Sequence, residues 1–435
     1  MRLPAYIKDN LLLKITSLNS GAMSIRMLLA FISQKILAVF LGPEGVAQIG
    51  NLRNVIPIIE SFSTLGIFNG VVKYVAEYKD DKEELQKLFS TSFVYITIAS
   101  LVAFCVLFFG AEYLNDLVFG EKKDCVIIFK ALAMAAPFIA MNRIFNGIVN
   151  GVSAYKSFIK INLISYTLSV IILMFFLYYK RLDGVLFAIA ITPILQFILL
   201  FYFFYNILKE YVKFNKISFE IPYKNELIAF TLMSFSSTIL SSVIDINLRV
   251  YLINNISEVD AGNWTGMTNI SKQYFMFITT ILTLYVIPKF SRIKTSIAFR
   301  LEVINIYKTL LPMFALGMIL IYFCREWVVI IAKSKEFIGM KPLFKWQLMG
   351  DFIRIASLIL MHQFLAKKLV RSFIFSEIIS LGLFYFLANY LVSIYGVEGV
   401  VMAHFFRYII YFFVVLYLVM RYFKKQDLIE FIKSE

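Results

Sequence analysis

The sequence predicts an all-α membrane protein that crosses the bilayer many times. Hydrophobic residues make up 60% of the 435 residues and the mean hydropathy is +0.78, whereas soluble domains are roughly 45–50% apolar. Apolar runs long enough to cross a bilayer, about 20 residues each, recur from end to end. No long polar stretch is left that could fold as a soluble domain. Together these observations favour a polytopic helical fold.

Twelve apolar segments are the predicted membrane spans. Their ends are placed only to within a few residues, because an apolar run does not mark where a helix leaves the bilayer. The spans cover roughly residues 18–41, 46–71, 91–110, 126–150, 158–179, 184–206, 227–254, 262–288, 303–331, 343–365, 372–394 and 397–420.

The twelve spans are predicted to form two lobes of six helices. A basic cytoplasmic linker, residues 207–226, separates an N-terminal lobe, residues 1–206, from a C-terminal lobe, residues 227–435. A weak internal similarity, in which Gly50 aligns with Gly266, suggests two lobes of like orientation. Parallel repeats of this kind surround a central cavity in several transporter folds.

The net charge of +15 has mainly a topological origin. With the N-terminus in the cytoplasm, the cytoplasmic segments hold roughly three Lys or Arg for each one on the opposite side, as the positive-inside rule expects. This bias predicts that both termini are cytoplasmic, and we expect no nucleic-acid partner. The basic residues inside the spans need another explanation.

Arg53 and Glu60 stand out in the second span. They lie seven residues apart, and therefore nearly on one face of a helix. An arginine in the bilayer core is costly, so it usually faces a bundle interior or a wet cavity and marks a transport pathway. The alternative is a structural ion pair between the two residues. We favour the pathway interpretation because of the cost.

The other spans of the first half differ in polarity. Arg26 and Lys35 of the first span point to nearly opposite faces, so both cannot face one cavity, and Arg26 is the better candidate because the apolar run MLLAF follows it directly. In the fourth span, Arg143 and Asn146 belong to a polar stripe, although Arg143 is close enough to the cytoplasmic end to snorkel. The fifth and sixth spans are almost wholly apolar and are predicted to be lipid-facing walls, with Pro193 as a kink.

The seventh span carries the clearest polar stripe. Its members are Ser234, Thr238, Ser241, Asp245 and Arg249. Their spacing keeps them on one face of a regular helix. Stripes of Ser and Thr often serve close helix packing, but an Asp and an Arg one turn apart favour a wet cavity.

Two later spans carry further charges. Lys272 follows Asn269 by less than one turn in the eighth span. In the tenth span, Asp351 and Arg354 share a face, so an internal ion pair and a ligand-binding role are equally plausible.

Several chemistries lack the residues that they need. His362 and His404 are the two histidines, far apart and in apolar surroundings. The three cysteines have no metal-ligand spacing. The sequence has no Gly-rich phosphate loop and no acidic pair in a loop for Mg²⁺. We therefore expect no cofactor, no bound metal and no enzymatic activity.

Four stretches of the sequence resemble Wzx-type polysaccharide flippases. They are GPEGVAQIGNLRNVI from Gly42, GIFNGVVKYVAEY from Gly66, WTGMTNISKQYFMFITTILTLYVIPKFSRI from Trp264 and FKWQLMGDFIRI from Phe344. The similarity is strongest to flippases for O-antigen and enterobacterial-common-antigen lipids. Four matching stretches in one order make it fairly specific.

The resemblance implies a twelve-helix member of the multidrug/oligosaccharidyl-lipid/polysaccharide exporter superfamily, with two six-helix lobes around a central cavity. It implies a bacterial inner-membrane protein of lipopolysaccharide or other surface-polysaccharide biosynthesis. The expected substrate is an undecaprenyl-diphosphate-linked oligosaccharide, moved from the cytoplasmic to the periplasmic leaflet. Expected partners are this glycolipid, membrane lipids and other proteins of the assembly pathway.

The resemblance also implies site residues. Arg53, Lys73 and Asp351 lie in the matching motifs, and Arg249 lies where the match is weaker. Arg26 is similar to cavity arginines in the first helix of the related lipid II flippases. The position of Lys272 can be acidic in the family, so this cavity is expected to be more basic.

Both lines of reasoning predict a basic cavity for a diphosphate. Its candidate residues are Arg26, Arg53, Lys73, Arg143, Asp245, Arg249, Lys272, Asp351 and Arg354. Alternating access would come from rocking of the lobes. Glu60, Asp245 and Asp351 are candidates for binding H⁺ or Na⁺, although salt-bridge switching is as plausible.

There are three alternative functions. A cation-coupled multidrug antiporter of the same fold is the main alternative, but its cavity should carry carboxylates rather than an excess of basic residues. A membrane-embedded glycan polymerase or ligase usually needs a sizeable loop outside the membrane, and a channel needs a symmetric selectivity filter. The sequence shows neither.

Overall fold

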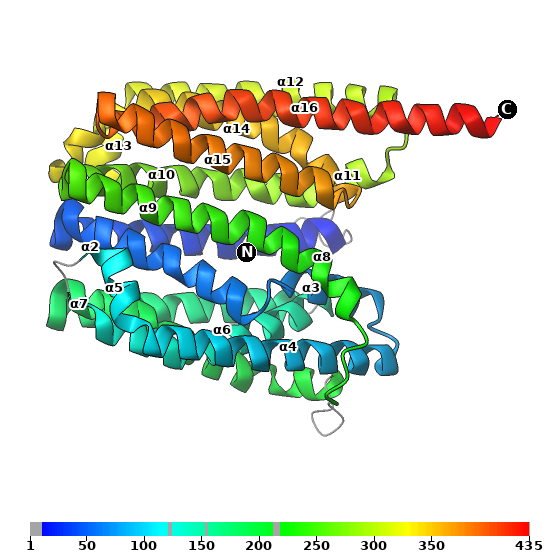
Figure 1. Ribbon diagram of the computed structural model, residues 1–435, viewed down its shortest axis with the longest axis horizontal. Helices are drawn as coiled ribbons and strands as arrows, with labels where there is room; N and C mark the ends of the chain where they lie inside the picture. The colour runs from blue at the N-terminus through cyan, green and yellow to red at the C-terminus, as the bar shows by residue number, and fades with distance from the viewer. Residues whose placement is uncertain (1–10, 121–123, 153–154, 212–217, 435) are drawn as a thin grey trace. The chain divides into compact units, whose positions relative to one another are not determined.

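The computed structural model describes residues 11–120, 124–152, 155–211 and 218–434 (Figure 1). Every regular element in this part of the chain is a helix. In chain order they are α2 (Leu11–Ser63), α3 (Phe68–Glu77), α4 (Lys82–Phe109), α5 (Ala111–Phe119), α6 (Val126–Gly151), α7 (Tyr155–Tyr211), α8 (Lys224–Ser234), η2 (Phe235–Ile239), α9 (Leu240–Asn255), α10 (Glu258–Ile281), η3 (Leu282–Val286), α11 (Ile287–Arg292), α12 (Ser296–Phe323), α13 (Arg325–Ala332), η4 (Lys335–Met340), α14 (Leu343–Ala366), α15 (Val370–Tyr395) and α16 (Glu398–Ser434).

Nine helical stretches of the described residues are long and apolar enough to cross a membrane. The prediction of an all-α polytopic membrane protein is thereby confirmed, while the number of twelve spans stays a prediction. Two of the nine, Ile25–Ser63 and Asn162–Phe203, are 39 and 42 residues long. Each contains two helices that meet at a residue with non-helical backbone angles, Gly42 in α2 and Arg181 in α7.

The break at Gly42 depends on glycine. Its φ of 63° lies in the left-handed region, where only a residue without a Cβ is unstrained. Pro43 follows directly and begins the next helix, a position where its fixed φ and missing N–H cause no loss. The sequence places a turn at this point correctly, but the turn is shorter than the four residues GPEG.

The second predicted span, residues 46–71, is wrong at its end. Helix α2 stops at Ser63, a turn follows, and α3 starts as a separate helix at Phe68. Gly66 makes this turn with a φ of 64°, and a Cβ placed there would lie 2.4 Å from the Cβ of Ser234. The turn therefore needs glycine both for its backbone angle and for the close approach of α8.

The seventh predicted span is also irregular. A π-helical turn, η2, separates α8 from α9. A π-helical turn inserts one extra residue, which rotates the following side chains by about 100° relative to a regular helix. Ser241, Asp245 and Arg249 keep the predicted regular spacing on α9, whereas Ser234 and Thr238 are related to them across or within the π-helical turn, so the spacing rule does not apply to the whole stripe.

The chain divides into two compact units. Unit 1 consists of Met1–Leu41 and Gln48–Ser242, and unit 2 consists of Gly42–Ala47 and Val243–Glu435. The predicted lobes, with a linker at residues 207–226, remain a prediction, and residues 212–217 of that linker lie outside the described residues.

Each unit is held together by apolar helix packing. In unit 1, α3 and α4 pack on α6 through a cluster of buried residues that includes Val71, Leu88 and Ile144. In unit 2, α14 packs against α12 and α16, and 67% of its most apolar window is buried, against 11% for α12. Helix α14 is therefore the centre of unit 2, and the polar residues that it carries must find partners inside the protein.

Candidate functional site

A polar cavity of about 300 Å³ lies within unit 1 between α2, α6 and α7. Its apolar lining residues include Pro193. Charged, amide and hydroxyl side chains supply the rest: Arg26, Glu60, Asn142, Arg143, Asn146, Asn162, Ser165, Tyr166 and Gln196. Three sequence-predicted residues, Arg26, Arg143 and Glu60, are thus brought together.

Glu60 is paired with Arg143 and not with Arg53. The Arg143 Nε and the Glu60 Oε1 are 2.6 Å apart. The Arg143 guanidinium also lies over the ring of Phe68, 3.7 Å from its centroid. The alternative interpretation of Arg53, a structural ion pair with Glu60, is therefore wrong.

Arg26 and Arg53 both lie near Tyr166. The Arg26 guanidinium is 5.0 Å from the centroid of the Tyr166 ring, and Arg53 interacts electrostatically with the same tyrosine. Neither arginine makes an ion pair with any residue that the structure describes. An arginine that is held by a ring face keeps its N–H donors available for an anion.

Helix α7 contributes to the lining of this cavity, which was not predicted from the sequence. Its two segments were predicted to be apolar walls facing lipid, but Asn162, Ser165, Tyr166 and Gln196 line the cavity. The Gln196 Nε2 donates to Ser169 Oγ at 3.0 Å and so links the two segments of α7. The sequence did contain a signal for this contribution, because Asn162, Ser165 and Tyr166 recur at helical spacing on one face of the fifth span.

Lys73 is not among the residues that line this cavity. It lies on α3, where its Nζ is 3.8 Å from Glu77 Oε2 and 4.1 Å from the centroid of the Tyr74 ring. Both partners are on the same short helix, so the contacts are local.

Asp351 is the centre of a buried polar network in unit 2. The residue is 0% exposed and its carboxylate accepts hydrogen bonds from α10, α14 and α16. The donors are Ser271 Oγ at 2.6 Å, Gln347 Nε2 at 3.0 Å, the Tyr274 hydroxyl, and His404 Nε2 at 2.9 Å.

His404 is a functional candidate that the sequence did not provide. The prediction placed it in apolar surroundings, and 12% of its side chain is exposed. Its ring bonds the carboxylate of Asp351, 53 residues earlier in the chain. No local pattern indicates this contact, because it depends on how α16 packs on α14.

Arg354 does not form the ion pair with Asp351 that its position suggested. Its guanidinium lies over Phe275, 4.1 Å from the ring centroid, and 5.6 Å from the centroid of Tyr408. Its buried Nε has no hydrogen-bond acceptor among the described residues. A ligand-binding role for Arg354 stays a prediction.

Arg249 is the most deeply buried of the predicted cations. It is 2% exposed, its Nε donates to Thr265 Oγ1 at 2.8 Å, and its guanidinium is 5.1 Å from the centroid of the Trp264 ring. These contacts join α9 to α10. Asp245 lies one turn before Arg249 and interacts with it electrostatically, whereas Lys272 is exposed on α10.

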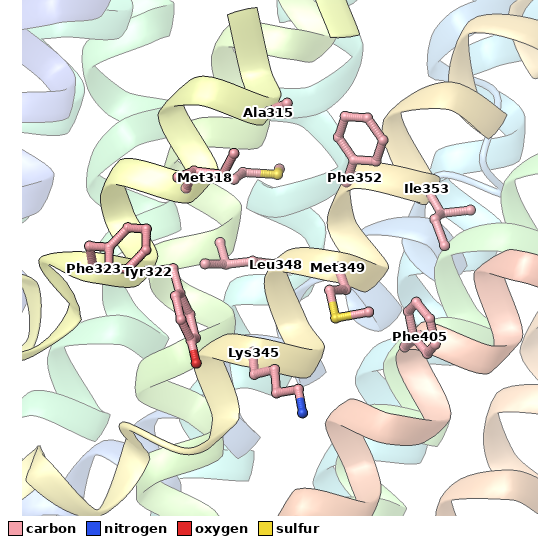
Figure 2. Close-up of a pocket in the computed structure, with 11 residues that line it drawn as sticks. Ala315, Met318, Tyr322, Phe323, Lys345, Leu348, Met349, Phe352, Ile353 and Phe405 are labelled. Atoms are coloured by element: carbon pink, nitrogen blue, oxygen red, sulfur yellow. The ribbon is translucent and has the colours of Figure 1, made fainter. Parts of the chain in front are cut away.

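A second cavity, of about 520 Å³, lies in unit 2 between α12, α14 and α16 (Figure 2). Its lining is apolar except for Lys345 and the hydroxyl of Tyr322. None of the predicted site residues lines it. This groove is therefore separate from the polar cavity in its residues and in its chemistry.

A comparison with known protein families identifies the family of this chain. The model of a family described as polysaccharide biosynthesis protein matches residues 12–294. The chain belongs to this family.

Relatives agree with this assignment. This chain is 27% identical over 382 residues to the lipid III flippase of Escherichia coli strain K12, and the match covers 87% of this chain and 91% of the relative. The family match and this relative together confirm the predicted resemblance to Wzx-type flippases, and they support a transporter rather than an enzyme.

Solved structures confirm the fold. An inward-facing multidrug transporter of the MATE family superposes with a TM-score of 0.78 at 14% identity, covering 94% of this chain and 98% of that one. The lipid II flippase MurJ superposes with a TM-score of 0.70 at 17% identity, covering 94% and 90%.

Proposed function

We propose that this protein is a flippase for a lipid-linked oligosaccharide in the bacterial inner membrane. The substrate would be an undecaprenyl-diphosphate-linked glycan, moved from the cytoplasmic to the periplasmic leaflet. The observation that carries the proposal is the cavity of unit 1, in which Arg26 has no carboxylate partner among the described residues and amides surround it.

The charge of this cavity suits an anion. Arg143 is neutralised by Glu60, so Arg26 leaves an excess positive charge, and Arg53 adds another beside Tyr166. A diphosphate group loses its hydration in a low-dielectric site, and arginine forks offset that loss because they match phosphate oxygens in geometry and charge.

The neutral polar residues suit a glycan. Asn142, Asn162 and Gln196 provide both donors and acceptors. Sugar hydroxyls need both kinds of partner, and amide side chains supply them without adding charge. The prenyl chain would remain in the lipid, since burying it in a polar cavity would bring no gain.

In unit 2 we propose that Arg354 contacts the substrate and that Asp351 does not. All four described donors around Asp351 come from the protein itself. With four hydrogen-bond donors, the Asp351 carboxylate would hold α10, α14 and α16 in position. Asp351 would also be a candidate for coupling transport to an ion. Glu60 and Asp245 remain candidates for the same role.

The alternative is a cation-coupled multidrug antiporter. It shares the fold, but export of organic cations calls for uncompensated carboxylates in the cavity. The carboxylate of Glu60 is compensated by Arg143 at 2.6 Å, which makes this alternative weaker.

The test is glycolipid flipping in proteoliposomes that contain an undecaprenyl-diphosphate oligosaccharide. We expect Arg26→Gln and Arg53→Gln each to slow flipping by about tenfold or more, because each removes a charge-assisted contact to the diphosphate. Lys130→Gln is the matched control. It removes a cation from α6 that does not line the cavity and whose Nζ is 5.9 Å from the centroid of the Phe108 ring.

Two results would contradict the proposal. Unchanged flipping by both arginine variants would show that the cavity does not bind the diphosphate. A wild-type protein that moves no glycolipid, across several glycans, but exports organic cations would support the antiporter.

A further inference from the structure

The apolar groove of unit 2 has a shape that a hydrocarbon chain can enter. Met318, Leu348, Met349 and Phe352 line it along its length, and Phe405 closes one side (Figure 2). Methionine side chains are flexible and polarisable, so they adapt to a chain without fixed geometry. The groove lies on helices that are long and apolar enough to cross the membrane, which exposes it to lipid rather than to water.

One end of the groove is polar. The ammonium of Lys345 and the hydroxyl of Tyr322 both point to this end, away from the apolar side chains (Figure 2). Tyr322 lies in the last turn of α12 and Lys345 in the first turn of α14. For two membrane-spanning helices, the C-terminal end of α12 and the N-terminal end of α14 are expected at the level where a bilayer changes from hydrocarbon to head groups.

The polar end carries an uncompensated positive charge. The Lys345 Nζ lies over the ring of Trp346, 5.1 Å from its centroid, and none of the ion pairs seen in the described residues includes Lys345. Arg325 lies over the Tyr322 ring at 4.4 Å and adds positive charge. The acidic neighbour Glu326 is already paired with Lys341, at 2.8 Å.

We propose that this groove is a binding site for an anionic glycerophospholipid. One acyl chain would lie along Leu348 and Met349, and the phosphodiester would accept hydrogen bonds from the Lys345 ammonium and the Tyr322 hydroxyl. Of the cations Lys345 and Arg325, only Lys345 lines the groove, and its ammonium matches the single negative charge of a phosphodiester, whereas a diphosphate diester, with about two charges, would be only half compensated by it. The site is separate from the proposed substrate cavity, and its occupation does not depend on transport.

The experiment is photo-crosslinking in proteoliposomes. Purified protein is placed in phosphatidylcholine vesicles with a trace of diazirine-labelled phosphatidylglycerol or, in a second arm, diazirine-labelled phosphatidylcholine. Labelled peptides are mapped by mass spectrometry. We expect several-fold more labelling of the α12 and α14 groove residues by phosphatidylglycerol, because only this lipid brings a net negative charge to Lys345.

Three variants sharpen the test. Lys345→Gln should remove the preference for phosphatidylglycerol, whereas Lys308→Gln, which removes a lysine of α12 that does not line the groove, should keep it. Met349→Trp should reduce labelling by both lipids because it fills the groove. Met349 is 42% exposed, so the larger side chain is tolerated by the fold, and unchanged size-exclusion profiles verify this.

Any of three results would overturn the proposal. Equal labelling by the two lipids would show no selectivity for charge, and an unchanged preference in Lys345→Gln would place the anion elsewhere. Displacement of the label by a polyprenyl diphosphate at lower concentration than by unlabelled phosphatidylglycerol would assign the groove to the substrate's lipid instead.

Discussion

At the scale of single residues, the two cavities and the buried network differ in how their charges are compensated. Glu60 and Asp351 are both acids inside membrane-spanning helices, but one has an arginine partner and the other is held by four neutral or weakly basic donors. Unpaired charge in a low-dielectric interior is costly. The basic groups without acidic partners are therefore the ones to test for binding.

Asp351 is predicted to stabilise unit 2. In Asp351→Leu, the buried donors Ser271, Gln347 and His404 lose their shared acceptor, which should lower the free energy of unfolding by at least about 3 kcal/mol. Thermal unfolding in detergent micelles would measure this as a fall in apparent Tm. Glu112→Leu is the control, because Glu112 is an exposed acid on α5 that makes no ion pair among the described residues. An equal loss in both variants would contradict a special role of Asp351.

A second residue-scale prediction concerns pH. The Tyr223 hydroxyl donates to Glu84 Oε2 at 2.5 Å, and burial, followed by this hydrogen bond, raises the pKa of Tyr223. We expect Tyr223→Phe to lower the free energy of unfolding by about 1 kcal/mol. Because only the unfolded chain ionises this tyrosine near its ordinary pKa of about 10, the difference between wild type and variant should be constant below pH 10 and shrink above it.

Chemical unfolding across this pH range would check the sign. Tyr113→Phe is the control, because Tyr113 is 71% exposed and should give no difference at any pH. A difference for Tyr223→Phe that grows above about pH 10 would contradict the assignment, since a raised pKa stabilises the folded state only while the unfolded tyrosine is neutral.

At the scale of elements, irregular turns decide where the polar side chains lie. The early end of α2 at Ser63 puts Lys73 on a separate helix, α3, and the π-helical turn η2 changes the phase between Ser234 and Arg249. Both features interrupt segments that are predominantly apolar. An apolar pattern alone does not reveal them, because the bilayer requires apolar residues whether or not the helix is regular.

The turn at Gly66 gives an element-scale prediction. Gly66→Ala combines a left-handed φ with a Cβ that would lie 2.4 Å from the Cβ of Ser234, so we expect a loss of about 2–4 kcal/mol in the free energy of unfolding. Gly396→Ala has a similar φ of 58° but no atom within 4 Å of its new Cβ. It should lose only the backbone part, about 1–2 kcal/mol. Equal losses in the two variants would show that the contact with α8 does not matter.

At the scale of the whole molecule, the chain is a family member with the fold of a transporter and with two chemically different cavities. The polar one contains an internal ion pair. Arg143→Gln should leave Glu60 as an unpaired negative charge beside Arg26, so we expect it to slow glycolipid flipping more than the double variant Arg143→Gln with Glu60→Gln.

Initial flipping rates in proteoliposomes would measure this ordering. The expected partial recovery in the double variant follows because neutralising both partners leaves the excess charge of Arg26 unchanged. If the double variant is slower than Arg143→Gln alone, Glu60 has a function of its own, such as binding an ion, and is more than a partner of Arg143.

Much of the site was predictable because charge in a membrane span is rare. Arg26, Arg53 and Arg143 were identified from the cost of burying them, and the structure places all three on α2 and α6 around Tyr166 or Glu60. The amides of α7 were missed because Asn162 and Gln196 are uncharged, so their burial in a membrane span is not costly enough to single them out. The partner of Glu60 was also missed, since helical spacing indicates only neighbours on one helix.

The sequence by itself determined the class of the protein. A helix that crosses a bilayer must be long and apolar, so membrane-spanning segments are visible as long apolar runs in the sequence. It also determined the family through four ordered motifs. The tertiary structure alone decided which charges are paired, as in Arg143 with Glu60 and His404 with Asp351. These contacts join residues 83 and 53 positions apart, and they depend on how separate helices pack, which no local periodicity specifies.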